Sequence, residues 1–170
     1  MAIKNTQRGF ALLIAIIFMS VMLTFGLALG SLAYKQQILA SSAIESQYAF
    51  YAADGALECA LYADQQASAF TPYPSINPPV SSVASIGCDG SSSAPENSSW
   101  TPARWIINYR IPLDSLTPYP RCADVTVYKY SAPQPGGVTT YLFSQGYDIS
   151  CAMIGSTGVR FSSRGISAHY

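Results

Sequence analysis

The chain has 170 residues, of which only 11% are charged, and its nine basic and nine acidic side chains give a formal net charge of zero. A surface that binds nucleic acid requires a basic stripe, and this balance of charges does not suggest one. We therefore expect no nucleic-acid partner. Once an apolar N-terminal segment is set aside, the remaining length is enough for one domain.

An apolar segment follows a short polar leader, residues 1–9, which contains Lys4 and Arg8. No charged residue occurs in residues 10–34. A helix of that length would extend about 37 Å, enough to cross a hydrocarbon core of about 30 Å. Because the basic residues precede the segment, we expect a single membrane pass with a cytoplasmic N-terminus and an exported body.

Three interpretations of this segment remain open: a cleaved secretory signal, a plain membrane anchor, and a helix that stays in the mature protein after its leader is removed. The segment is longer than the roughly 7–15 apolar residues of a signal peptide, which disfavours the first. Within it, Gly26 and Gly30 form a Gly-x-x-x-Gly pattern that lets apolar helices pack closely.

The helix is expected to continue well beyond the apolar segment, since no proline occurs before about Gln66. Its second half, residues 35–66, is amphipathic. One apolar face is predicted to contain Phe50, Ala53, Leu57 and Leu61. Further alanines keep this half slim enough to lie against a sheet.

The exported body divides into a loop region and a strand region. Residues 67–103 are rich in Pro and Ser, which predicts a connecting loop with at most a short strand near 80–86. Residues 104–170 contain apolar alternation and turn signals that predict four antiparallel strands in one sheet, with a bulge near Gly165 in the last. The expected fold is therefore α+β, a long N-terminal helix packed on a four-stranded antiparallel sheet.

Tyrosines are frequent in the predicted strands. We expect them on the sheet face away from the helix, either as an adhesive or subunit-contact surface or simply because tyrosine favours strands. They are Tyr109, Tyr119, Tyr128, Tyr130, Tyr141 and Tyr147.

The four cysteines are Cys59, Cys88, Cys122 and Cys151. None are spaced as Cys-x-x-Cys, and the single histidine, His169, is penultimate, so we expect no metal site. An exported chain meets an oxidising compartment, which favours two disulfides; the three possible pairings stay open.

Motifs for catalysis or cofactor binding are absent from the sequence. It has no Gly-x-Ser-x-Gly, no phosphate-binding loop and only scattered carboxylates. We therefore expect no catalytic residue, no cofactor and no enzymatic activity.

Two stretches resemble a known family. The run Gln7-Arg8-Gly9-Phe10-Ala11-Leu12-Leu13 resembles the class III leader junction of type IV prepilins. Residues 46–58 resemble the Phe-x-Ala-Ala-Glu-Ala-Ala-Leu stretch of the minor-pilin and tip-pseudopilin family whose N-terminal region is named after PilX, with Asp54 in place of the usual Glu. The resemblance covers about residues 8–62.

This resemblance implies that a prepilin peptidase cuts after Gly9 and methylates Phe10, leaving the helix in the mature subunit. It also implies contact with other pilin subunits through that helix and with an inner-membrane assembly platform. The fifth mature residue is Ile14, where most pilins carry a Glu that pairs with a neighbouring N-terminal amine. Its absence implies a minor or initiating tip subunit.

The leading hypothesis is thus a non-catalytic structural subunit of a type IV pilus or related filament. It would be held in the cytoplasmic membrane before assembly and lie in an extracellular filament at the cell surface afterwards. The alternative is a membrane-anchored extracellular binding or adhesion domain that does not polymerise.

Overall fold

The computed structural model describes the backbone of residues 6–70, 72–114, 117–118 and 120–170, and their side chains from residue 10 onward. The described residues form two compact units that divide at Ser42. The elements, in chain order, are α1 (Thr6–Gln65), the 3₁₀ turn η1 (Val80–Ser82), β1 (Ile86–Cys88), β2 (Ser91–Ser93), β3 (Pro95–Trp100), β4 (Arg104–Leu113), β5 (Arg121–Gln134), β6 (Val138–Tyr147), the 3₁₀ turn η2 (Cys151–Met153) and β7 (Ser163–His169).

The first unit contains the apolar part of α1. Its hydroxyl side chains, those of Ser20, Thr24 and Ser31, each donate to the carbonyl three residues earlier. This pairing satisfies polar groups within the helix itself, as an apolar surrounding requires. Among the described residues, α1 is the one helix long and apolar enough to cross a membrane. The predicted apolar helix is confirmed.

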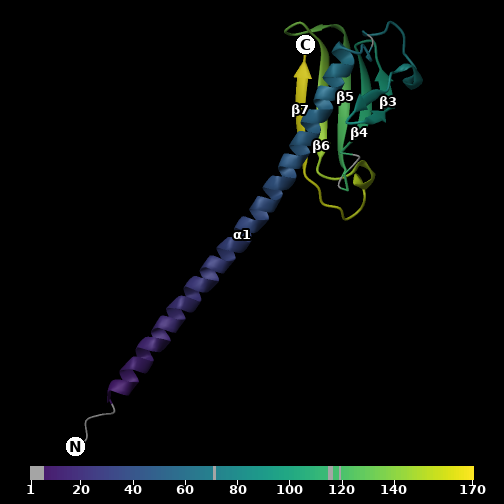
Figure 1. Ribbon diagram of the computed structural model, residues 1–170. Helices are drawn as coiled ribbons and strands as arrows, with labels where there is room; N and C mark the ends of the chain where they lie inside the picture. Colours follow the sequence, from purple (N-terminus) through teal and green to yellow (C-terminus); the bar gives the residue numbers. More distant parts are fainter. Residues whose placement is uncertain (1–5, 71, 115–116, 119) are drawn as a thin grey trace, which may run out of the picture. The chain divides into compact units, whose positions relative to one another are not determined.

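The second unit is built on an antiparallel sheet in the order β3-β4-β5-β6-β7 (Figure 1). Its core follows the predicted alternation along β4, where Trp105, Ile107, Tyr109 and Ile111 are all buried. The α+β fold is confirmed.

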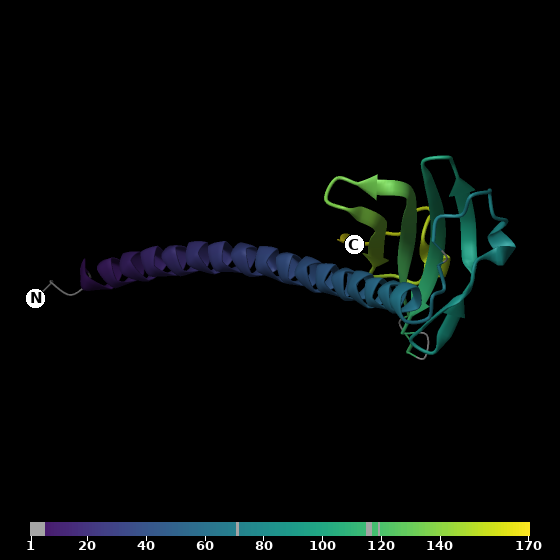
Figure 2. The ribbon, with the colours of Figure 1, turned by 90° about the horizontal axis from the view of Figure 1, so that it is seen from above.

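Residues 43–65 of α1 lie along one face of this sheet (Figure 2). The side chains that make this contact are mostly alanines, and they are buried: Ala49, Ala52, Ala53, Ala56, Ala60 and Ala63, together with Leu57. Opposite them on β6, a Cβ built on Gly146 would collide with backbone atoms of Ala49 and Ala53. A glycine is therefore required for the helix to approach this closely.

One residue of the predicted apolar face was assigned wrongly. Phe50 is 44% exposed, whereas its neighbour Ala49 is fully buried. The helix is rotated so that small residues meet the sheet, because a phenylalanine at the closest contact would hold the helix away from Gly146.

The sheet has five strands and not the predicted four. The additional strand is β3, which pairs antiparallel with β4 and lies at the edge of the sheet. It falls in the segment expected to be a loop, which also contains the β1–β2 hairpin and η1. The residues of β3 show no apolar alternation, and their side chains are half-exposed or exposed. The strand is therefore held in the sheet by its backbone pairing with β4.

Two further expectations about the strands were wrong. The register of β7 on β6 runs without a shift through Gly165, so there is no bulge. A Cβ at Gly165 would instead lie 2.8 Å from the ring of Phe143, which explains the glycine. Tyr109 and Tyr147 are buried and do not belong to an exposed face. Tyr119 lies outside the described residues.

Candidate functional site

The most prominent surface feature is the apolar length of α1 between Phe10 and Tyr34. Every residue in this stretch is exposed, including Phe10 and Ile14, and the stretch carries no charge. Continuous apolar surface of this extent marks a contact with lipid or with other proteins. The backbone of Gly9 and of residues 6–8 before it lies within α1, whereas residues 1–5 and all side chains before Phe10 lie outside the described residues.

Predicted packing positions on this surface are open. A Cβ at Gly26 or Gly30 would meet no atom within 4 Å, so each leaves a shallow place on the helix where another backbone can approach. Ile14 presents an aliphatic side chain, and the first carboxylate after Phe10 in the sequence is Glu45. The apolar stretch therefore has no acidic group with which to bind an amine.

The cysteines lie in two places in the sheet-bearing unit. Cys122 at the start of β5 is bonded to Cys151 in η2, with a Cα–Cα distance of 4.8 Å. Cys59 on α1 and Cys88 on β1 are thiols. One of the two predicted disulfides is thus present, and it points to an extracytoplasmic location for this unit.

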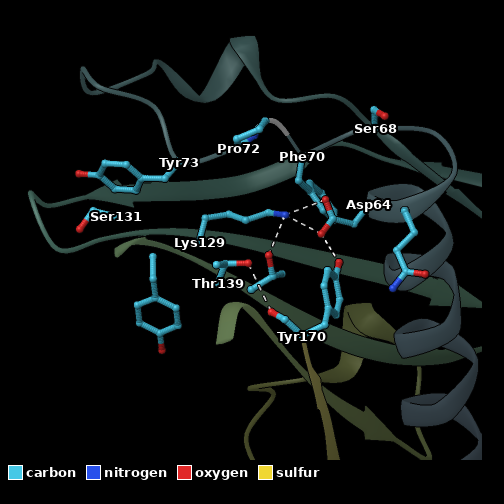
Figure 3. A pocket seen from close by; sticks show the side chains of 12 residues that line it. Asp64, Ser68, Phe70, Pro72, Tyr73, Lys129, Ser131, Thr139 and Tyr170 are labelled. Atoms are coloured by element: carbon cyan, nitrogen blue, oxygen red, sulfur yellow. Dashed lines mark hydrogen bonds and ion pairs between the residues drawn. The ribbon is translucent and has the colours of Figure 1, made fainter. Parts of the chain in front are cut away.

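A cavity of about 640 Å³ lies beside the C-terminal end of α1 (Figure 3). Its polar centre is the ion pair between Asp64 on α1 and Lys129 on β5, with 2.5 Å between Nζ and Oδ2, and both side chains are buried. Tyr170 donates a hydrogen bond to the same carboxylate. The remaining wall includes Phe70 and Tyr73.

The charges in this cavity are satisfied by one another. The ammonium of Lys129 donates to both carboxylate oxygens of Asp64 and to the hydroxyl of Thr140 at 3.1 Å, which uses its three donors. No donor of Lys129 is left to hold a ligand. The group connects α1 to the sheet through side chains and is structural.

Sequence reasoning missed this ion pair, although a signal was present. Ala123, Val125, Val127 and Lys129 occupy alternate positions of β5 and share its buried face. A lysine in the apolar phase of a strand requires a buried partner.

A second cavity, of about 530 Å³, is lined by Tyr48 and Cys59 of α1 and by Arg121, among others. The guanidinium carbon of Arg121 lies 4.1 Å from the ring centroid of Tyr48, a cation–π contact. The same side chain pairs with Asp114 at 2.5 Å.

The sheet face away from α1 carries part of the predicted tyrosine surface. Tyr128 and Tyr141 contact each other edge to face, and His169 stacks on Tyr141. Nearby, Asp124 binds Arg110 at 2.8 Å and accepts from the hydroxyl of Tyr147. Burial, and next the charge of Asp124, raise the pKa of Tyr147.

No cluster of three or more His, Cys, Asp or Glu side chains suited to a metal ion occurs among the residues that the structure describes. Comparison of the chain with protein-family models, with curated proteins and with solved structures finds no match.

Proposed function

We propose that this protein is a non-catalytic structural subunit of a type IV pilus or a related pilin-like filament. The observation that carries the proposal is the division of α1. Its charge-free length from Phe10 to Tyr34 is exposed, and its residues 43–65 pack on an antiparallel sheet. An exposed apolar helix continuous with the scaffold of a folded domain suits a subunit that moves from lipid into the core of a fibre.

Ile14 supports a minor or initiating role within such a filament. An intramembrane carboxylate costs about 3 kcal/mol unless it is paired, so a subunit that carries one gains by pairing it with the amine of a neighbour. An isoleucine removes that incentive and leaves only apolar packing, for which Gly26 and Gly30 provide open positions. Such a subunit is suited to the start or tip of a fibre.

Before assembly the subunit is held in the cytoplasmic membrane, where prepilin peptidase removes the leader at the cytoplasmic N-terminus, and its sheet-bearing unit lies outside. Afterwards the apolar helix packs against the helices of other pilin subunits in a filament at the cell surface. The Cys122–Cys151 disulfide supports an extracytoplasmic location for the sheet-bearing unit.

The test is the chemical identity of the mature N-terminus. The full chain is expressed in a bacterium that assembles type IV pili, purified from membranes and from sheared filaments, and examined by mass spectrometry. A methylated Phe10 in both fractions is the expected result.

Other outcomes contradict the proposal in distinct ways. A chain that begins at Met1 and never enters filaments is a membrane-anchored binding domain, and one that begins at Tyr34 had its apolar segment removed as a signal. Gly9→Val is expected to block processing. Gly55→Ala serves as its control, because a Cβ at Gly55 meets no atom within 4 Å.

A further inference from the structure

Cys59 and Cys88 form a pair that the Cys122–Cys151 disulfide leaves over. They come from different elements, α1 and β1; Cys88 belongs to the hydrophobic core and Cys59 packs against it. Cys88 is buried, whereas Cys59 is half-buried and lines the 530 Å³ cavity beside Arg121. One sulfur of the pair is therefore reachable from outside and the other is shielded.

The side chains of Cys59 and Cys88 share a hydrogen bond. The thiol of Cys88 donates to the sulfur of Cys59, and this bond lowers the pKa of Cys59, against the opposing effects of burial and of the charges of Asp89 and Glu58. The same bond, together with burial, raises the pKa of Cys88. Cys59 is thus the member of the pair that ionises first, and it is also the accessible one.

We propose that Cys59 and Cys88 form a second disulfide after export, which ties α1 to β1. Cys59 packs against the core cluster that contains Cys88, and Asp89, the residue after Cys88, lines the same cavity as Cys59, so the bond would join neighbouring parts of the fold. This inference depends on export of the sheet-bearing unit and does not depend on polymerisation.

The reaction is an exchange with an oxidising disulfide, either of a protein thiol oxidase or of a small molecule in the exported compartment. The thiolate of Cys59 attacks one sulfur of that disulfide and releases the other as a thiolate. Cys88 gives its proton to the released thiolate and attacks the sulfur of Cys59. The pair loses two electrons, and the oxidant leaves as two thiols.

The bond would restrain the segment between α1 and the sheet. Residues 67–85 contain no strand and one short 3₁₀ turn, η1, among their described members, so few backbone hydrogen bonds order them. Closing this segment into a covalent loop lowers the entropy of the unfolded chain. Loss of the bond is expected to lower Tm by about 5–10 °C.

Tryptic mapping of the full chain tests the pairing directly. The protein is purified from membranes in detergent, denatured with iodoacetamide and without reductant, and digested. Because Lys35 and Arg104 have no Lys or Arg between them, Cys59 and Cys88 fall in one peptide, residues 36–104. Cys122 and Cys151 fall in peptides 122–129 and 130–160.

The expected result is an unalkylated peptide 36–104, lighter by two hydrogen atoms than its reduced form, beside peptides 122–129 and 130–160 joined to each other. Alkylation of both Cys59 and Cys88 in this sample would overturn the proposal. So would a link from peptide 36–104 to either of the other two.

Cysteine variants separate a disulfide from two packed thiols. Cys59→Ser should expose Cys88 to alkylation in the denatured chain while the Cys122–Cys151 link persists. Cys59→Ser, Cys88→Ser and the double variant should each lower Tm by the same amount. Reductant should lower Tm more in the wild type than in the double variant. An equal effect of reductant on these two proteins would contradict the bond. The state of the N-terminus is read separately, so failure here leaves the filament proposal standing.

Discussion

The two halves of α1 differ in the size of their apolar side chains, and this difference separates two kinds of surface. From Phe10 to Tyr34 the helix carries Leu, Ile, Phe and Met, and all are exposed. From Ala49 to Ala63 the buried face is made almost entirely of alanine. Where the protein supplies its own partner, small side chains allow a sheet to come close. Where the side chains are large and uncovered, the partner must come from outside the chain.

The packing of the alanine-lined half on the sheet is expected to be stabilised most by the buried ion pair between Asp64 and Lys129. Lys129→Met leaves the carboxylate of Asp64 buried without its counter-charge, and the loss in free energy of unfolding should be about 3–5 kcal/mol. Urea unfolding of the full chain in detergent, followed by circular dichroism, measures it.

Two further variants control this experiment. Arg110→Met breaks the half-exposed pair with Asp124 and should cost no more than about 1 kcal/mol. Adding Asp64→Leu to Lys129→Met should recover much of the loss, because both charges are then gone. Equal losses from Lys129→Met and Arg110→Met would show that the helix does not depend on the buried pair.

A charge placed in the apolar half should weaken membrane insertion and leave the stability of the sheet-bearing unit unchanged. Leu23→Asp places a carboxylate in the middle of the exposed apolar stretch, at a cost to membrane insertion of about 3 kcal/mol. Carbonate extraction should release the variant from membranes, while the unfolding midpoint of the sheet-bearing unit stays unchanged. Leu23→Ala is the matched control. Retention of Leu23→Asp in the membrane would mean that lipid is not the outside partner of this half.

A single added methyl group tests the close approach of helix and sheet. Gly146→Ala puts a Cβ against the backbone of Ala49 and Ala53, so α1 must shift, at a cost of about 1–3 kcal/mol. Gly55→Ala, on the same helix with open space around it, should be neutral or stabilise by up to about 1 kcal/mol. If both variants unfold at the same urea concentration, the contact is looser than the structure has it.

Local patterns in the sequence were enough to predict the helix and most of the sheet. The absence of proline predicted α1, and the alternation of Trp105, Ile107, Tyr109 and Ile111 predicted β4 with its buried side. The burial of Phe50 was predicted wrongly, because Ala49 and Phe50 are both apolar. Their sizes decide which one faces Gly146, and hydropathy does not record size.

Features that depend on distant partners could not be predicted in the same way. Strand β3 has no apolar alternation. It forms because the backbone of β4 offers hydrogen bonds to a further strand on that side of the sheet. The Cys122–Cys151 pairing follows from where β5 and η2 meet in space. The partner of Lys129, in turn, lies on α1, far away in the sequence.

The smallest expected effect concerns Tyr109, a tyrosine of β4 that is buried in the hydrophobic core. Burial raises the pKa of Tyr109, whose hydroxyl donates to the carbonyl of Ala84 at 2.8 Å. The native state therefore keeps its proton at a pH where the unfolded state, with a pKa of about 10, loses it. Stability from this group is fully present below pH 10 and falls as the pH rises above it.

Tyr109→Phe should isolate this contribution. At pH 8 the variant lacks the hydrogen bond and should be less stable by about 1 kcal/mol. At pH 11 the wild type loses about 1 kcal/mol that the variant has no group to lose, so the two should converge. Other buried tyrosines, such as Tyr147, titrate in both proteins and cancel in the comparison. Urea unfolding at the two pH values gives the difference directly. A gap that stays constant would mean that the hydroxyl of Tyr109 reaches solvent, and that α1 and the sheet do not seal the core between them.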